Sequence, residues 1–152
     1  GEHQNMTTIA VGSDHAGYHL KEQLAQQLRD LGHEVLDLGA HSTDRVDYPD
    51  FGAAVGRAVA GGQAELGGCV CGSGLGIAMA ANKIAGVRAA PVHDVTSAHL
   101  TRQHNNANVI CFGERLIGAD VAAEALVAWL DAEFEGGRHA GRVEKLDGLV
   151  NE

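Results

Sequence analysis

The chain has 152 residues, which fits a single domain of ordinary size. Hydrophobic residues make up 45% and charged residues 20%, so the chain can bury a core and is not expected to be disordered. A formal net charge of −9 makes nucleic acid and anionic membranes poor partners, and no apolar run has the length of a membrane span.

Apolar runs and helical patterns alternate along the chain. Read in order they predict a strand at 8–12, a helix at 17–31, a strand at 34–38, a helix at 50–60, a strand at 66–71, a helix at 76–83, a strand at 87–92, a helix at 94–104, a strand at 108–112 and helices at 119–134 and about 140–150. Pro49 suits a first helical turn, and Pro91 suits a strand end or an edge strand. The pattern predicts an α/β fold, a three-layer α/β/α sandwich with a Rossmann-like, five-stranded parallel sheet.

The alternation predicts one domain over residues 6–152, closed by the C-terminal helix. Residues 1–5 are polar, precede Met6 and are interpreted as an N-terminal extension or a cloning remnant. Three cysteines without a C-x-x-C pair favour reduced thiols and a cytoplasmic location. Glycine is in excess, at 21 residues, about twice its usual share of about 7%.

A glycine-rich loop follows the third predicted strand. Gly72, Gly74 and Gly76 leave the backbone N–H groups open to an anion. A dinucleotide fingerprint fits poorly, because Ile77 stands where its third glycine belongs, and a tight packing turn is an equal alternative. Cys71 begins the loop beside a helix start, where a thiol ionises more easily.

Polar residues also follow other predicted strands and helices. Asp14 and His15 come directly after the first strand, where ligands bind in parallel sheets. His104 ends the fourth helix, where the helix dipole alone also favours a histidine. Arg138 and Arg142 share a helix face that fits either an anion clamp or a solvated basic surface. No histidine pair has clear metal-ligand spacing with a third partner, so no metal site is expected.

Several segments together resemble the sugar-phosphate isomerase family that includes ribose-5-phosphate isomerase B and galactose-6-phosphate isomerase. They are GSDHAGYHLK, RVDYPDF, CGSGLGIAMAANK, SAHLTRQHNNANVICFGER and EGGRHAGRVEKL, and they span Thr8 to about Leu146. The resemblance implies a homodimer, or a tetramer, with active sites shared between subunits and no metal or cofactor. It also implies interconversion of ribose 5-phosphate and ribulose 5-phosphate through an enediolate.

The resemblance assigns roles to individual residues. Cys71 matches the catalytic base of one branch of the family, with Ser73 assisting it, since Ile77 replaces the glutamate of the other branch. His104 and Asp14 match the pair that opens the sugar ring. The residues expected to bind substrate are His15, Tyr48, Gly72, Gly74, Gly76, Asn105, Arg115, Arg138 and Arg142. Two alternatives stay open: a six-carbon sugar 6-phosphate as substrate, or a nucleotide-binding module without catalysis.

Overall fold

A parallel sheet forms the centre of the molecule, as predicted. The computed structural model describes residues 7–150, and within that range five parallel strands follow the order β2-β1-β3-β5-β4. The elements are β1 (Thr8–Ser13), α1 (Tyr18–Asp30), β2 (Glu34–Asp37), α2 (Tyr48–Ala60), β3 (Leu66–Cys71), α3 (Leu75–Ala81), β4 (Ala89–Pro91), α4 (Val95–Gln103), β5 (Val109–Gly113), α5 (Ala119–Asp131) and α6 (Arg138–Leu149). The extension expected at residues 1–5 lies outside the described residues.

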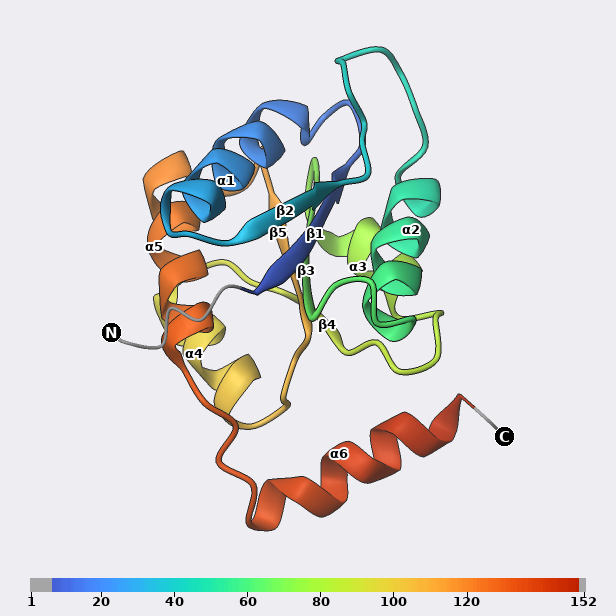
Figure 1. Cartoon of the computed structure of the whole chain (residues 1–152), viewed down its shortest axis with the longest axis vertical. Coiled ribbons are helices and arrows are strands. Elements are labelled where there is room, and N and C mark those ends of the chain that lie inside the picture. Colours follow the sequence, from blue (N-terminus) through green and yellow to red (C-terminus); the bar gives the residue numbers. More distant parts are fainter. Residues whose placement is uncertain (1–6, 151–152) are drawn as a thin grey trace.

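Helices cover both faces of the sheet, with α1, α4 and α5 on one face and α2 and α3 on the other (Figure 1). The first face packs long apolar side chains around Trp129, which is fully buried. The second face is built from smaller residues, among them Cys69 and Cys111. Small residues on that face let α2 and α3 lie close to the strands that carry the glycine-rich loop.

Strand order creates a crevice at the carboxyl edge of the sheet. From β1 the chain crosses to β2 on one side, while β3 lies on the other side of β1. The loops after β1 and β3 therefore diverge and leave a gap between them, which is where ligands bind in such sheets. Ser13 pairs with Val70 in the register, so the two loops begin side by side.

Most predicted elements are present, with shifted ends. The strand predicted at 87–92 is reduced to Ala89–Pro91, because it lies at the sheet edge and pairs with β5 alone. The helix predicted at 119–134 ends at Asp131, since Ala132 is already extended. Between residues 7 and 150, every helix is too short or too polar to cross a lipid bilayer.

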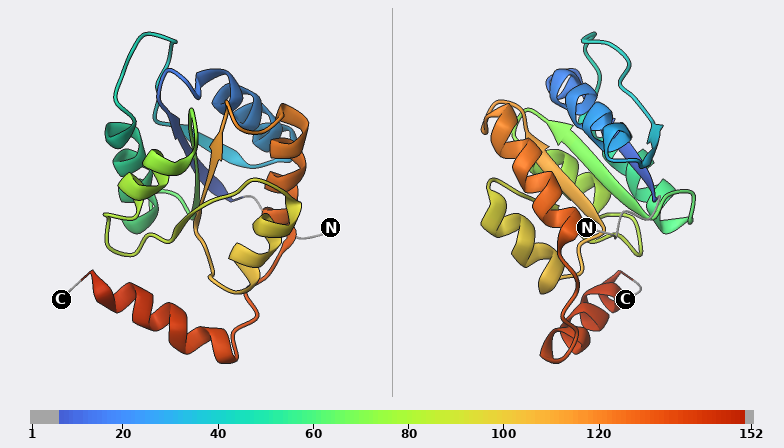
Figure 2. Two further views of the ribbon diagram at one scale, coloured as in Figure 1. Left: turned by 180° about the vertical axis from the view of Figure 1, so that it is seen from behind. Right: turned by 60° about the vertical axis from the view of Figure 1, so that its left-hand side comes forward.

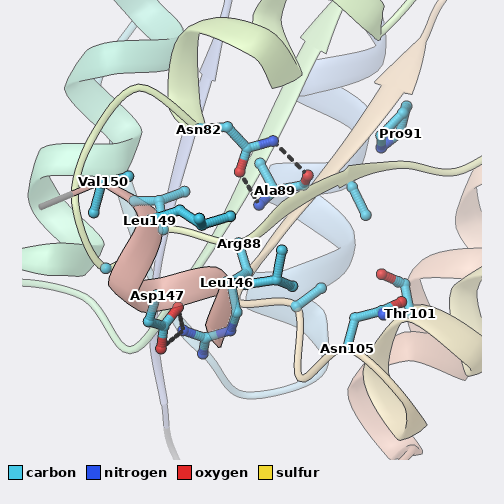
Figure 3. Close-up of a pocket in the computed structure, with 14 residues that line it drawn as sticks. Asn82, Arg88, Ala89, Pro91, Thr101, Asn105, Leu146, Asp147, Leu149 and Val150 are labelled. Carbon is cyan, nitrogen blue, oxygen red and sulfur yellow. Dashed lines mark hydrogen bonds and ion pairs between the residues drawn. The ribbon is translucent and has the colours of Figure 1, made fainter. Parts of the chain in front are cut away.

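Helix α6 stands apart from the three layers (Figure 2). An ion pair between Arg88 and Asp147, at 3.1 Å, ties it to the loop before β4. Beside this pair, the Asn82 side chain donates to the Ala89 carbonyl and accepts from the Ala89 N–H, both at 2.8 Å (Figure 3). Leu146 and Leu149 remain about half exposed on α6, at 49% and 59%.

Candidate active site

A cavity of about 460 Å³ opens in the crevice between the loops that follow β1 and β3. Its walls come from these two loops, the start of α2 and the loop after β5. The lining residues are Asp14, His15, Ala16, Tyr48, Cys71, Gly72, Ser73, Gly76, Arg115 and Leu116. The structure thus gathers most of the residues that the sequence assigned to catalysis and substrate binding in one cavity.

The thiol of Cys71 has the surroundings of a usable base. It ends β3 and is 4% exposed, and its Sγ accepts a hydrogen bond from the Gly74 N–H at 3.1 Å. That donor stabilises negative charge on sulfur. Cys111 differs, because a hydrogen bond with Cys69 and complete burial raise its pKa well above the ordinary value. Cys69 and Cys111 are therefore core residues.

The glycine-rich loop can adopt its shape only with glycine at two positions. Gly74 has a φ of +77°, and a Cβ there would lie 2.8 Å from the Phe112 carbonyl carbon. A Cβ on Gly76 would lie 2.6 Å from the ring of Tyr48. These glycines bring the loop against β5 and let the Tyr48 ring close one side of the cavity.

Hydrogen bonds to backbone groups hold the side chains of the loops that follow β1 and β3. Asp14 is buried and accepts from the Gly17 N–H at 3.0 Å, which closes the turn before α1. His15 Nδ1 lies 3.0 Å from the Val46 carbonyl oxygen and 3.2 Å from the Val46 nitrogen, which fixes the ring at the cavity wall. Ser73 Oγ accepts from the Leu75 N–H at 3.2 Å.

Arg115 reaches the cavity from the loop after β5. Its N–H donates to the Gly72 carbonyl at 3.0 Å, and its guanidinium lies over Gly72. Sequence reasoning missed Glu114, whose Oε1 accepts from the Leu20 N–H at 2.7 Å and so ties this loop to α1. Glu114 also follows a strand end, but its carboxylate turns toward α1 and does not line the cavity.

The remaining predicted residues do not reach this cavity within one chain. His104 and Asn105 follow α4, which runs back toward the amino edge of the sheet, and Arg138 and Arg142 lie exposed on α6. Asn105 lines a separate cavity of about 440 Å³ between α6 and the β4 region, drawn in Figure 3. The residues carried over from the family thus form two groups.

In the second group, His104 is stacked on His139. The ring centroids are 4.3 Å apart and the planes differ by 15°. Desolvation lowers the pKa of His139, and the charges of His104, Arg138 and Arg142 lower it further, against the opposing effect of Glu135. His139 and Glu135 were not assigned any role from the sequence.

Comparison with known proteins decides the family. The ribose/galactose isomerase family model matches residues 9–146. The chain belongs to the ribose/galactose isomerase family. It is a sugar-phosphate isomerase with the aldose–ketose chemistry of that family.

Individual relatives cover almost the whole chain. Ribose-5-phosphate isomerase B of Escherichia coli is 46% identical over 95% of this chain and 97% of its own length. D-erythrulose-4-phosphate isomerase of Pectobacterium atrosepticum is 42% identical over 93% of each chain. The solved structure of ribose-5-phosphate isomerase B from Clostridium thermocellum has a TM-score of 0.93 at 47% identity, covering 95% of this chain and 97% of that one.

A solved relative also carries a ligand. Ribose-5-phosphate isomerase B from Mycoplasma genitalium, with bound ribulose 5-phosphate, has a TM-score of 0.92 at 38% identity. It covers 97% of this chain and 99% of that one. The likeness therefore extends to a solved relative with a bound sugar phosphate.

Proposed function

We propose that this isomerase interconverts D-ribose 5-phosphate and D-ribulose 5-phosphate, with Cys71 as the base. The observation that carries the proposal is the Cys71 thiol at the cavity wall, with the Gly74 N–H on its sulfur at 3.1 Å. In the forward direction the thiolate removes the proton on C2 of the aldose. The electron pair forms the C1–C2 double bond of an enediolate while the carbonyl pair moves onto O1. A proton passes from O2 to O1, and the Cys71 thiol returns its proton to C1 as the C2 carbonyl of the ketose forms.

The negative charge that develops on the substrate oxygen must be stabilised by hydrogen-bond donors that are already in position. Backbone N–H groups from Gly72 to Gly76 that are not already bonded, as those of Gly74 and Leu75 are to Cys71 Sγ and Ser73 Oγ, serve as these donors. The Asn105 side chain is the further donor that the family resemblance supplies. A single donor of this kind is worth about 3 kcal/mol in the transition state. Ser73, at the cavity wall, assists the Cys71 thiol.

The phosphate and the ring oxygen define the other end of the substrate. His15 and Arg115 line the cavity and supply positive or donor groups for the phosphate. Arg138 and Arg142 complete the phosphate clamp, and His104 with Asp14 opens the furanose ring. Tyr48 borders the sugar. These steps use side chains and backbone of the protein alone.

Two copies of the chain complete each site in this proposal. The cavity with Cys71 and the group with His104 lie at opposite edges of the sheet, so one chain cannot bring both to the same substrate. A homodimer, or a tetramer built from it, places the second group of one subunit over the cavity of the other. Helix α6 lies apart from the three layers, and its side chains Leu146 and Leu149 are about half exposed. Both features support a contact between α6 and a second subunit. The free thiols fit the cytoplasmic location expected from the sequence.

Replacing Cys71 tests the base. Cys71→Ala should abolish turnover of ribose 5-phosphate in a coupled assay, with unchanged far-UV circular dichroism and an unchanged elution volume. Cys111→Ala is the matched control, because it removes an equally buried thiol outside the cavity and should stay active. Activity retained in Cys71→Ala would contradict the assignment.

Mixing two inactive variants tests the shared site. Cys71→Ala and His104→Asn damage different groups, so subunit exchange should restore about one quarter of wild-type activity, from the intact sites of mixed dimers. Cys71→Ala mixed with Arg115→Ala is the control, since both changes lie in one cavity and every mixed site stays defective. No recovery in the first mixture would contradict sharing between subunits.

A second candidate substrate is favoured by the relatives. An erythrulose-4-phosphate isomerase and a galactose-6-phosphate isomerase subunit from Clostridium acetobutylicum are 42% and 39% identical to this chain, close to the value for a ribose-5-phosphate isomerase. Comparing kcat/KM for four-, five- and six-carbon sugar phosphates decides between them, with the five-carbon substrate expected to be preferred. Tight binding of NAD or AMP without any turnover would instead favour the nucleotide-binding alternative.

A further inference from the structure

Three side chains outside the cavity converge at one point. The His104 Nε2 atom lies 3.8 Å from Glu135 Oε1, and the His139 Nε2 atom lies 3.5 Å from the same oxygen. One ligand atom from each residue falls within 4.8 Å of the other two. His104 ends α4, Glu135 lies in the linker before α6, and His139 lies in its first turn.

The backbone holds these residues together. The Glu135 N–H donates to the Gln103 carbonyl at 3.0 Å, which binds the linker to the end of α4 next to His104. Gly136 and Gly137 both have positive φ, at 66° and 52°, and turn the chain so that α6 begins beside the linker. The His139 N–H then donates to the Gly136 carbonyl at 2.9 Å. Main-chain hydrogen bonds and the two-glycine turn therefore fix the positions from which these three side chains meet.

We propose that His104, Glu135 and His139 bind a divalent transition-metal ion of the Zn²⁺ class. Two imidazoles and one carboxylate are the protein ligands of a common open zinc site, in which water fills the fourth position. With bonds of about 2.0–2.1 Å, neighbouring ligand atoms of a tetrahedral site lie about 3.3 Å apart. These two separations exceed that value by a few tenths of an ångström, and the two stacked rings must tilt relative to each other for both Nε2 lone pairs to meet one ion.

Exposure and charge set the character of the site. The Glu135 side chain is 51% exposed and that of His104 35%, so an ion can enter and keep water ligands. Arg138 and Arg142 add positive charge near His139 and oppose a cation. The carboxylate of Glu135 is therefore required for binding, because it supplies the negative charge among the three ligands.

Occupation of the site would inhibit the isomerase. The metal takes the Nε2 lone pair of His104, and that imidazole can no longer exchange a proton with the sugar ring. This consequence rests on the proposed role of His104 in ring opening, whereas binding of the metal does not. The site thus gives the enzyme a reversible block by free Zn²⁺ that leaves Cys71 untouched.

Metal binding is measured first, in a Cys71→Ser background that removes the competing thiolate. Titration with Co²⁺, followed by visible absorption, should show one four-coordinate ion per chain. Glu135→Gln and His139→Gln should each weaken binding by about tenfold or more. Glu133→Gln and His93→Gln are matched controls, an exposed carboxylate nearby and an exposed histidine elsewhere, and should bind like the parent. Equal affinity in all variants, or no ion bound at a large excess, would overturn the site.

Inhibition is measured next, with Cys71 intact. Zn²⁺ should inhibit turnover of ribose 5-phosphate, a chelator should restore it, and Glu135→Gln should raise the inhibiting concentration by about tenfold. Inhibition that is unchanged in Glu135→Gln would assign the effect to another ligand such as the Cys71 thiolate, and would overturn the inhibitory role. A protein that binds Co²⁺ through these residues but turns over no ribose 5-phosphate would refute the proposed substrate and leave the metal site standing.

Discussion

Gly74 and Gly72 stand two residues apart in the same loop, but alanine should destabilise the protein at Gly74 and leave its stability almost unchanged at Gly72. In Gly74→Ala, the residue must keep a φ of +77°, which costs about 1–2 kcal/mol for a side chain with a Cβ. The new Cβ also lies 2.8 Å from the carbonyl carbon of Phe112 and 3.0 Å from the nitrogen of Gly113. Overpacking against this buried backbone adds about 1–3 kcal/mol.

Together these effects lower the stability of Gly74→Ala by about 2–5 kcal/mol. For a chain of this size, Tm should fall by roughly 5–15 °C. Turnover should fall as well, because relief of the contact moves the N–H that donates to Cys71 Sγ. A hydrogen bond to a charged group is worth about 1.5–3 kcal/mol, so kcat should drop roughly 10- to 100-fold.

Gly72→Ala is the matched comparison. Its φ lies outside the left-handed range, and its Cβ would approach the Arg115 side chain no closer than 3.4 Å, an ordinary contact. Stability should stay within about 0.5 kcal/mol of wild type. The added methyl lies beside the guanidinium in the cavity, so KM for ribose 5-phosphate should rise. Thermal melts and a coupled assay on both variants suffice, and an equal loss of Tm in the two would refute the reasoning.

Further predictions concern the buried Lys21, the Asp94 helix cap and His104, the histidine proposed to open the sugar ring. Lys21 is 1% exposed and donates to both oxygens of Asp37, so Lys21→Met should lower stability by about 3–5 kcal/mol in chemical denaturation, and an unchanged midpoint would contradict this. The Ser97 N–H lowers the pKa of Asp94, so this cap stabilises the fold above a pH of about 4 and loses its effect as the pH falls through the lowered pKa. Asp94→Asn keeps a capping oxygen but cannot ionise, so its Tm should fall less than that of the wild type as the pH is lowered below about 4. An equal fall of Tm in the two proteins would exclude the effect. His104→Asn should lose turnover of ribose 5-phosphate, which must open a ring, but much less turnover of a four-carbon aldose 4-phosphate, whose blocked O4 cannot close a furanose. An equal loss on both substrates would argue against a ring-opening role.

The fold follows from local patterns that the sequence displays. Alternating apolar runs and amphipathic segments indicate the five strands and six helices found between residues 7 and 150. The position of residues after β1 and β3 indicates the cavity, because parallel topology brings those loops together. Helix ends were less accurate, as at Asp131, since no glycine or proline marks the point where the chain becomes extended.

Contacts between distant residues were outside the reach of spacing arguments. His104 and Glu135 are brought together by a linker hydrogen bond and a two-glycine turn, which no periodicity reveals. Lys21 lies in an amphipathic helix, where a charged residue is expected to face solvent. In the structure its side chain is buried, and its ammonium group donates to the Ala40 carbonyl and the Asp37 carboxylate. The separation of the two residue groups depends on the length and direction of α4, which becomes visible only in three dimensions.

The Asn82 side chain and Pro91 close the outer edge of β4 against other β-strands. An open edge offers free N–H and carbonyl groups to any extended chain and invites aggregation. Here both backbone groups of Ala89 are bonded to the Asn82 amide, and Pro91 has no N–H to donate. The sheet therefore cannot continue from one molecule into the next across this edge. Crowded molecules are therefore protected from growing into shared sheets at β4.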